Sequence, residues 1–236
     1  MAKYLLNIRY FLFFIGMTLI ILTDTGCQSL GKNSAKPDNL PIETGRIVIL
    51  GFIPGMPQSG ETGIIQSPIS GAAFMAEPVD QSVADNLTDR LFSRMLGFKR
   101  YDLISSDQAK GVLFNAISSN QGMRDLEIFQ KTGQAFSADA VMAGYIYRWQ
   151  EREGTNYSAK RPSSVAFELY LIRSSDKAIL WKGRFDKTQK ALSENIFDMG
   201  LFLKSKGKWM TADELAELGI EELLGVSSLE EHKSDH

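Results

Sequence analysis

Side chains that commonly perform covalent chemistry are scarce in this chain. Of its 236 residues, two are histidine (His232 and His236, both in a charged C-terminal tail) and one is cysteine, Cys27. A Ser-His-Asp triad, a Cys-His pair and a His/Cys zinc site each need residues that the body of the chain lacks. We therefore expect no catalytic residue, no metal ligand and no bound cofactor.

Two short motifs resemble catalytic elements and are better explained as structure. Ser174 and Lys177 have the Ser-x-x-Lys spacing of penicillin-binding enzymes, but that motif works at the start of a buried helix. Here the pair lies between two predicted strands, which indicates a solvated turn. The segment 51–63 contains glycines after a strand, but it lacks the Gly-Lys-Ser/Thr ending of a phosphate-binding loop.

The N-terminus has the pattern of an export signal. Lys3 and Arg9 precede the apolar run Phe11–Leu22, which is about twelve residues long, whereas a membrane-spanning helix needs roughly 20. We predict a signal peptide over residues 1–26. The alternative is an uncleaved anchor over 4–22, which Asn7 and Arg9 would interrupt.

A single cysteine follows this apolar run directly. Gly26-Cys27 is similar to the end of a bacterial lipobox, in which the thiol receives acyl chains such as palmitate and becomes the new N-terminus, although Asp24 replaces the usual aliphatic residue. Two or three acyl chains hold a protein firmly in a leaflet. Gln28 after the cysteine is typical of outer-membrane lipoproteins. We predict lipidation at Cys27, with simple secretion to the periplasm as the alternative, and a flexible tether over 27–44.

The segment 45–225 alternates strand and helix patterns. A β-branched run over 46–52 predicts a buried strand, and residues 53–80 show no clear period, which is typical of a mobile loop or a loop covered by a short pairing element. Ser82 with Asp85 predicts the start of a helix that ends at Gly97. Next come a predicted strand at 101–105, a helix capped by Ser106 and a helix over 126–136. The helix capped by Ser106 has a predicted core face of Ala109, Val112, Leu113, Ala116 and Ile117.

Three strands then follow one another, at 140–149, 165–173 and 178–185, with a turn at 174–177. The two-residue period places Tyr145, Tyr147 and Trp149 on one face of the first of them. Two further helices are predicted, over 192–203 and after a Thr211/Glu214 capping box. The order predicts a single α/β (α+β) domain over 45–225, with one mixed sheet, an antiparallel meander and packed helices, followed by a disordered tail at 226–236.

The segment from Trp181 to Trp209 mixes aromatic and basic residues. Either the aromatic side chains belong to the core and the bases face water, or the segment is a docking face for an anionic or amphipathic partner. The candidate interaction residues are Trp181, Phe197, Phe202, Lys204, Lys206, Lys208 and Trp209.

The chain resembles the α/β domain shared by penicillin-binding-protein activator lipoproteins, the curli-export lipoprotein and the N-terminal domain of TolB. Four segments carry the resemblance, which covers about residues 46–185: Ile47–Phe52, Val83–Leu91, Tyr101–Ile104 and Ala138–Gly144. The usual Leu-Pro-Phe after the first strand is Leu50-Gly51-Phe52 here. The resemblance implies a non-enzymatic periplasmic domain that docks on envelope machinery, and no catalytic residue carries over.

We therefore expect an outer-membrane lipoprotein that binds an unidentified envelope protein or assembly. The formal net charge of −2 argues against nucleic acid as the main partner. The alternative is a small-ligand binder or envelope hydrolase that uses residues 53–80 as a lid. A cleft lined by acids beneath that segment would favour the alternative, and a solid core would exclude it.

Overall fold

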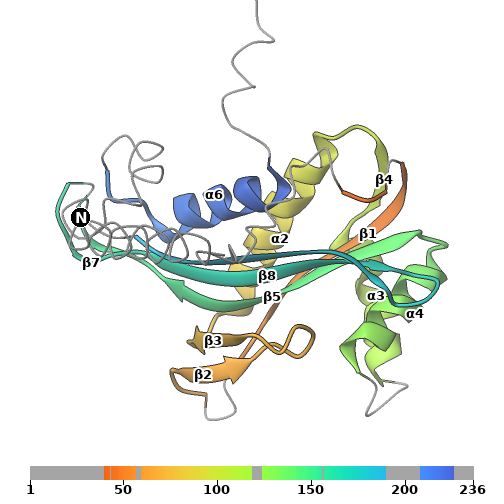
Figure 1. The fold of residues 1–236 in the computed structure, drawn as a ribbon, viewed down its shortest axis with the longest axis horizontal. Coiled ribbons are helices and arrows are strands. Elements are labelled where there is room, and N and C mark those ends of the chain that lie inside the picture. The colour runs from red at the N-terminus through yellow and green to blue at the C-terminus, as the bar shows by residue number, and fades with distance from the viewer. Residues whose placement is uncertain are drawn as a thin grey trace, which may run out of the picture. The chain divides into compact units, whose positions relative to one another are not determined.

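The computed structural model describes residues 40–42, 44–56, 60–118, 124–155, 157–189 and 208–225. Over these residues a mixed five-stranded sheet packs against four helices, which confirms the predicted fold class (Figure 1). The helices are α2 (Gln81–Leu96), α3 (Ser106–Ser118), α4 (Asp125–Ala135) and α6 (Ala212–Leu224).

The main sheet has the strand order β4-β1-β5-β8-β9, and β1 pairs in parallel with both β4 and β5. Strands β5, β8 and β9 form the predicted antiparallel meander. The strands are β1 (Gly45–Pro54), β4 (Tyr101–Ile104), β5 (Ala140–Gln150), β8 (Ser164–Arg173) and β9 (Ile179–Thr188). A short hairpin of β6 (Glu153–Gly154) and β7 (Ala159–Arg161) connects β5 to β8.

The departure from Leu-Pro-Phe at the end of β1 has a structural reason. Gly51 has φ 75° at an irregularity of the β1–β5 register, and a Cβ atom there would lie 2.1 Å from Oγ1 of Thr88 on α2. This hydroxyl accepts the Phe52 amide at 2.9 Å and donates to the Ala84 carbonyl at 2.8 Å. Glycine therefore permits both the left-handed backbone and the close approach of strand and helix.

Helices α2 and α6 cover one face of the sheet, which we call the helix face (Figure 1). Its core contains Phe167, whose ring contacts Phe52 and Phe185 at centroid distances of 5.2 Å. At the rim, Arg94 of α2 donates to Glu217 at 2.6 Å and to Glu221 at 2.7 Å of α6. These bonds hold together two helices that lie far apart in the sequence.

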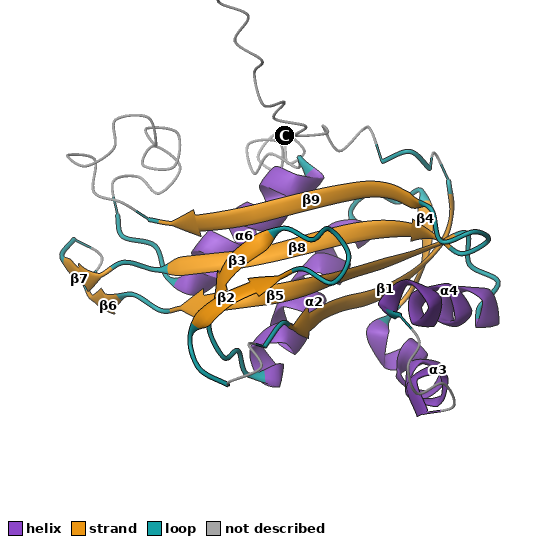
Figure 2. Ribbon diagram, turned by 60° about the horizontal axis from the view of Figure 1, so that its bottom comes forward, coloured by secondary structure: helices purple, strands orange, loops and turns teal. Residues whose placement is uncertain are grey.

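The opposite face, which we call the hairpin face, is covered by α3, α4 and a two-stranded hairpin (Figure 2). The hairpin consists of β2 (Gly63–Gln66) and β3 (Ala73–Ala76), so the segment 53–80 contains the short pairing element that the sequence left open. Phe74 and Ala76 of β3 are buried, whereas Ile64 and Met75 on the outer side are exposed. Because successive side chains of β3 point to opposite faces, one face of the hairpin packs on the sheet and the other faces solvent.

The two-residue period of β5 is interrupted near its end. Tyr145 and Tyr147 lie in the core of the hairpin face, but Trp149 packs against the core of the helix face. The β5–β8 register shifts between Ile146 and Arg148, and a bulge of this kind reverses the facing of later side chains. The prediction that Trp149 shares a face with the two tyrosines is therefore wrong.

The predicted core face of α3 is confirmed only in part. Ala109 is fully buried, Val112, Leu113 and Ala116 are only half-buried, and Ile117 is 51 % exposed. Helix α3 packs on α4 and β1 at the end of the sheet, so a smaller part of its surface is covered than an amphipathic pattern suggests.

Helix starts agree in part with the predictions. The capping box before α6 is present, since Thr211 and Glu214 exchange both bonds. Helix α2 begins after Asp80, so Ser82 is already inside the helix and caps nothing. At α3 the cap is displaced by one residue, because Ser105 exchanges bonds with Gln108.

The packed domain includes residues that the sequence placed in the tether. Leu40 is 5 % exposed in the core of the helix face, and the Ile42 carbonyl accepts the Tyr101 hydroxyl at 2.9 Å. The predicted signal peptide, the helix over 192–203 and the tail over 226–236 lie outside the described residues. Among the described helices, none combines the length and apolarity needed to cross a bilayer.

Candidate functional site

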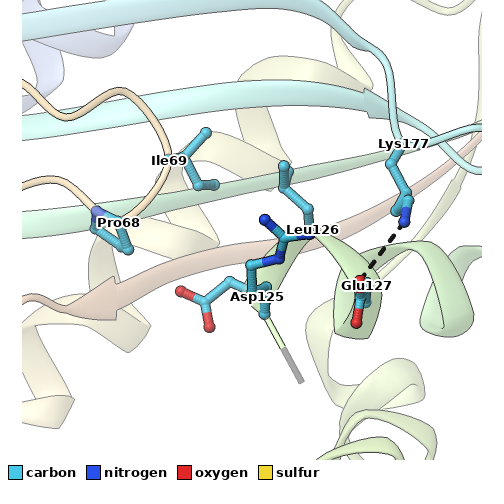
Figure 3. A pocket seen from close by; sticks show the side chains of 7 residues that line it. Pro68, Ile69, Asp125, Leu126, Glu127 and Lys177 are labelled. Atoms are coloured by element: carbon cyan, nitrogen blue, oxygen red, sulfur yellow. Dashed lines mark ion pairs between the residues drawn. The ribbon is translucent and has the colours of Figure 1, made fainter. Parts of the chain in front are cut away.

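An open pocket of about 440 Å³ lies on the hairpin face, between the turn of the β2–β3 hairpin and the start of α4 (Figure 3). The turn between β8 and β9 closes its third side. The lining residues are Pro68, Ile69, Arg124, Asp125, Leu126, Glu127 and Lys177.

The hairpin turn is held by its own polar groups. The Ser67 amide donates to the Ala72 carbonyl at 2.8 Å, and the Ser67 hydroxyl accepts the amide of Ser70 at 3.2 Å. These bonds define the positions of Pro68 and Ile69, which form an apolar wall of the pocket.

The turn after β8 is held against α4. Side-chain amides of Gln130 and Gln134 donate to the carbonyls of Ser175 and Ser174, at 2.9 Å and 3.0 Å. Lys177 follows this turn with φ 65°, a left-handed conformation that is unusual for a residue with a Cβ atom. Its ammonium lies 3.6 Å from Glu127 of α4, as Figure 3 shows.

A network of buried polar groups lies under the hairpin. Glu168 of β8 is 4 % exposed and accepts three hydroxyl groups. Tyr170 donates at 2.7 Å and Tyr147 at 3.2 Å to Oε2, while Ser70 of the hairpin turn donates at 2.8 Å to Oε1. The Ser67 and Tyr170 hydroxyls also bond at 3.1 Å. The carboxylate is thus satisfied internally and connects the hairpin to the sheet.

Arginine side chains hold the second hairpin strand. Arg148 of β5 is 8 % exposed, donates to the Met75 carbonyl at 3.0 Å and pairs with Asp186 of β9 at 2.6 Å. Arg184 donates to the Ala73 carbonyl at 3.1 Å. The hairpin is therefore bound to both edges of the β5–β8–β9 meander, and it is a fixed element rather than a free flap.

Aromatic contacts fill the space under the hairpin. The rings of Phe74 and Tyr147 stack with centroids 4.1 Å apart, and the guanidinium of Arg184 lies 4.1 Å from the Phe74 centroid on the other side. Aromatic side chains therefore pack in direct contact beneath Phe74. The open pocket of the 53–80 segment lies beside residues 68–69 instead, and its lining includes Asp125 and Glu127 together with two bases.

The tyrosines of this face keep their protons. Burial raises the pKa of Tyr170 to about 12; the hydroxyls of Ser67 and Ser70 lower this pKa, and the adjacent Glu168 carboxylate raises it. Burial likewise raises the pKa of Tyr147, and burial together with the hydrogen bond to Asp125 raises the pKa of Tyr145. As neutral donors they hold the two carboxylates in place.

The arrangement is suited to binding. The buried carboxylate is enclosed by donors. The open pocket is lined by exposed Arg124 and by the half-buried charges of Asp125, Glu127 and Lys177, and the elements that carry them are fixed to one sheet. Within the described residues, no group of three or more His, Cys, Asp or Glu side chains could hold a metal ion.

The structure places only some of the residues that the sequence singled out. Trp181 is 9 % exposed and belongs to the core of the helix face, and Trp209 is half-buried. Lys208 is exposed, and its carbonyl accepts the Gln189 side chain at 2.9 Å. The others lie outside the described residues: Cys27, Phe197, Phe202, Lys204 and Lys206. Their roles stay predictions.

The pocket and the network beneath the hairpin were missed by the sequence analysis. One signal was available: Glu168 is the only charged residue in the apolar run 164–172, and a charge in a fully buried strand needs partners. Two of the partners are Tyr147 of β5 and Tyr170 of β8. The third is Ser70 of the hairpin turn, and no local pattern connects it to β8.

The fold defines a mixed α/β domain, and solved structures similar to it include lipoproteins. Lipoprotein GNA1162 from Neisseria meningitidis is 13 % identical with a TM-score of 0.37, over 68 % of this chain and 92 % of that chain. The PelC dodecamer from Paraburkholderia phytofirmans is 12 % identical with a TM-score of 0.39, over 78 % and 88 %. The LpoB C-terminal domain from Salmonella enterica is 11 % identical with a TM-score of 0.36, over 62 % and 84 %.

The last of these is a domain of a penicillin-binding-protein activator lipoprotein, the class of protein that the sequence resembles. Protein-family models and curated proteins gave no match. At these identities and TM-scores, the likeness does not say what this chain binds.

Proposed function

We propose that this chain is a lipid-anchored protein of the bacterial outer membrane, facing the periplasm, whose α/β domain binds an envelope protein and catalyses no reaction. The binding surface is the pocket between the β2–β3 hairpin and α4. The observation that carries the proposal is the rigid fixing of the hairpin: Glu168, Arg148 and Arg184 bond it to the sheet beside an open pocket with charged walls.

The anchor rests on the N-terminal sequence. A basic start, a short apolar run and Gly26-Cys27 support export followed by lipidation. Metabolic labelling with an alkyne fatty acid should mark the wild-type chain and leave Cys27→Ala unmarked, while Ser29→Ala serves as the matched control. An intact mass that retains Met1 and lacks acyl chains would contradict the anchor.

Site-specific crosslinking tests the binding surface. A photo-crosslinking residue at Ile69 should capture a defined envelope protein in intact cells, whereas the same residue at exposed Tyr157 on the β6–β7 hairpin should not. Capture from both positions to the same background level would contradict the pocket as the binding surface.

The basic segment near residue 209 is a second proposed contact. The cluster Lys204, Lys206 and Lys208 with its neighbouring aromatic residues supports contact with an anionic or amphipathic surface. The triple change to Glu should reduce recovery of the crosslinked partner. Unchanged recovery would restrict the binding surface to the pocket.

A further inference from the structure

The charged side chains around the pocket differ in whether they have hydrogen-bond or ion-pair partners. Asp125 already accepts the Tyr145 hydroxyl, and Glu127 faces the ammonium of Lys177. Arg124, in contrast, makes no side-chain hydrogen bond or ion pair with any described residue. A guanidinium has five donors in a planar fork that matches a carboxylate. The lining contains two acids and two bases, and Arg124 is the base whose donors have no partner among the described residues.

Lys177 is held in a conformation that favours glycine. A left-handed backbone is disfavoured for side chains with a Cβ atom, and such residues persist where the surrounding structure fixes them. The two glutamine bonds from α4 fix this turn, and the lysine side chain lies along the pocket. Its pairing distance of 3.6 Å to Glu127 is longer than a direct hydrogen bond, so the ammonium keeps donors for another acceptor.

Two walls of the pocket carry apolar side chains. Pro68 and Ile69 of the hairpin turn lie opposite Leu126 of α4 (Figure 3). The volume of about 440 Å³ is within the range of small-ligand sites, roughly 300–1,000 Å³. An occupant that contacts both these apolar side chains and the basic groups of Arg124 and Lys177 carries an aliphatic group beside a negative charge.

From these walls we infer that the pocket binds a carboxylate side chain adjacent to an aliphatic side chain in an extended segment of the protein partner. The carboxylate lies between Arg124 and Lys177, and the aliphatic group contacts Ile69 and Leu126. This inference rests on the proposed binding function and names the chemistry of its partner.

A short peptide tests the inference directly. The probe is the peptide Gly-Ser-Leu-Glu-Ser-Gly, blocked at both ends, and the control replaces Glu by Gln. Titration into the isotope-labelled chain that starts at residue 28 should shift the amide resonances of Ile69, Leu126 and Lys177. The Gln peptide should bind about tenfold more weakly, the effect of losing one charge-assisted bond.

Two variants separate binding from stability. Lys177→Gly removes the ammonium and relieves the left-handed strain, so it should lower peptide affinity about tenfold without lowering the unfolding midpoint. Arg124→Ala should have a similar effect on affinity. The control Lys182→Ala removes an exposed lysine of β9 outside the pocket and should change neither quantity.

The outcomes separate the inference from the proposed function. Equal binding of the Glu and Gln peptides, or unchanged affinity in Lys177→Gly, overturns the carboxylate site while crosslinking from Ile69 can still succeed. Binding of the peptide with shifts confined to β9 or α6 also overturns it. Loss of crosslinking from Ile69 in cells, with peptide binding intact, overturns the proposed function instead.

Discussion

On the helix face of the sheet, Phe167 and Leu169 of β8 meet apolar side chains of α2 and α6. On the hairpin face the alternate residues of the same strand, Glu168 and Tyr170, meet hydroxyl groups of a hairpin turn. One strand therefore supplies an apolar core on one side and a polar network on the other. The difference indicates that the helix face contributes most of the stability of the domain, whereas the hairpin face carries the proposed binding surface.

The largest effect is expected on the helix face. Phe167→Ala should lower the free energy of unfolding by about 3–5 kcal/mol, because it removes a fully buried ring that contacts Phe52 and Phe185. Urea unfolding measures this loss. An effect below that of the Glu168 variant described next would reverse the comparison of the two faces.

A smaller and more local effect is expected on the hairpin face. Glu168→Ala leaves the hydroxyls of Tyr147, Tyr170 and Ser70 without their acceptor and should cost about 2–3 kcal/mol. Amide hydrogen exchange should accelerate in residues 63–76 more than in α2. Glu168→Gln, which keeps one acceptor, should cost less. Uniform acceleration over the whole chain would show that the hairpin is not a separate unit.

The pH dependence at high pH should belong to the hairpin face. Unfolded tyrosine loses its proton near pH 10, whereas Tyr170 keeps its proton up to about pH 12. A raised folded pKa contributes stability that is complete below pH 10 and is lost as the pH rises from 10 to 12. Tyr170 alone should contribute roughly 1.4 kcal/mol of this loss per pH unit. Tyr145 and Tyr147, whose pKa values are also raised, add to the loss, and Tyr170→Phe should reduce its slope. An unchanged slope in that variant would assign the pH dependence to other groups.

The smallest effect concerns the rim of the helix face. Arg94→Ala removes the bonds to Glu217 and Glu221 and should cost about 1 kcal/mol, because these side chains are only partly exposed. Arg46→Ala, at the exposed pair with Asp102, is the control and should cost less than roughly 0.5 kcal/mol. Equal costs would mean that the partial burial of the Arg94 pairs does not increase their contribution to the free energy of unfolding.

Strong local patterns were sufficient for most elements of the helix face. The period of α2 and the capping box of α6 depend on residues three or four positions apart, so the sequence predicts them directly. The hairpin face was predicted less well, because β2 and β3 have four residues each and their stability comes from β5, β8 and β9. The predicted face of Trp149 was wrong for a related reason, since a bulge depends on how β5 pairs with β8.

The candidate site follows the same division. Lys177 was noted in the sequence as part of a turn, and that turn is present. Its position beside Arg124, Glu127 and Ile69 depends on the packing of three segments that lie far apart in the chain. No spacing rule connects them, and the pocket became visible only with the tertiary structure.

The sequence by itself determined the class of the domain and its meander, and it predicts export, because each depends on composition or on the periodicity of neighbouring residues. Tertiary structure decided that residues 63–76 form a fixed hairpin, that Glu168 accepts the hydroxyl of Ser70 98 positions away, and that a charged pocket lies beside α4. Hydrogen bonds and packing between distant segments depend on the arrangement of the whole sheet, which local patterns do not contain.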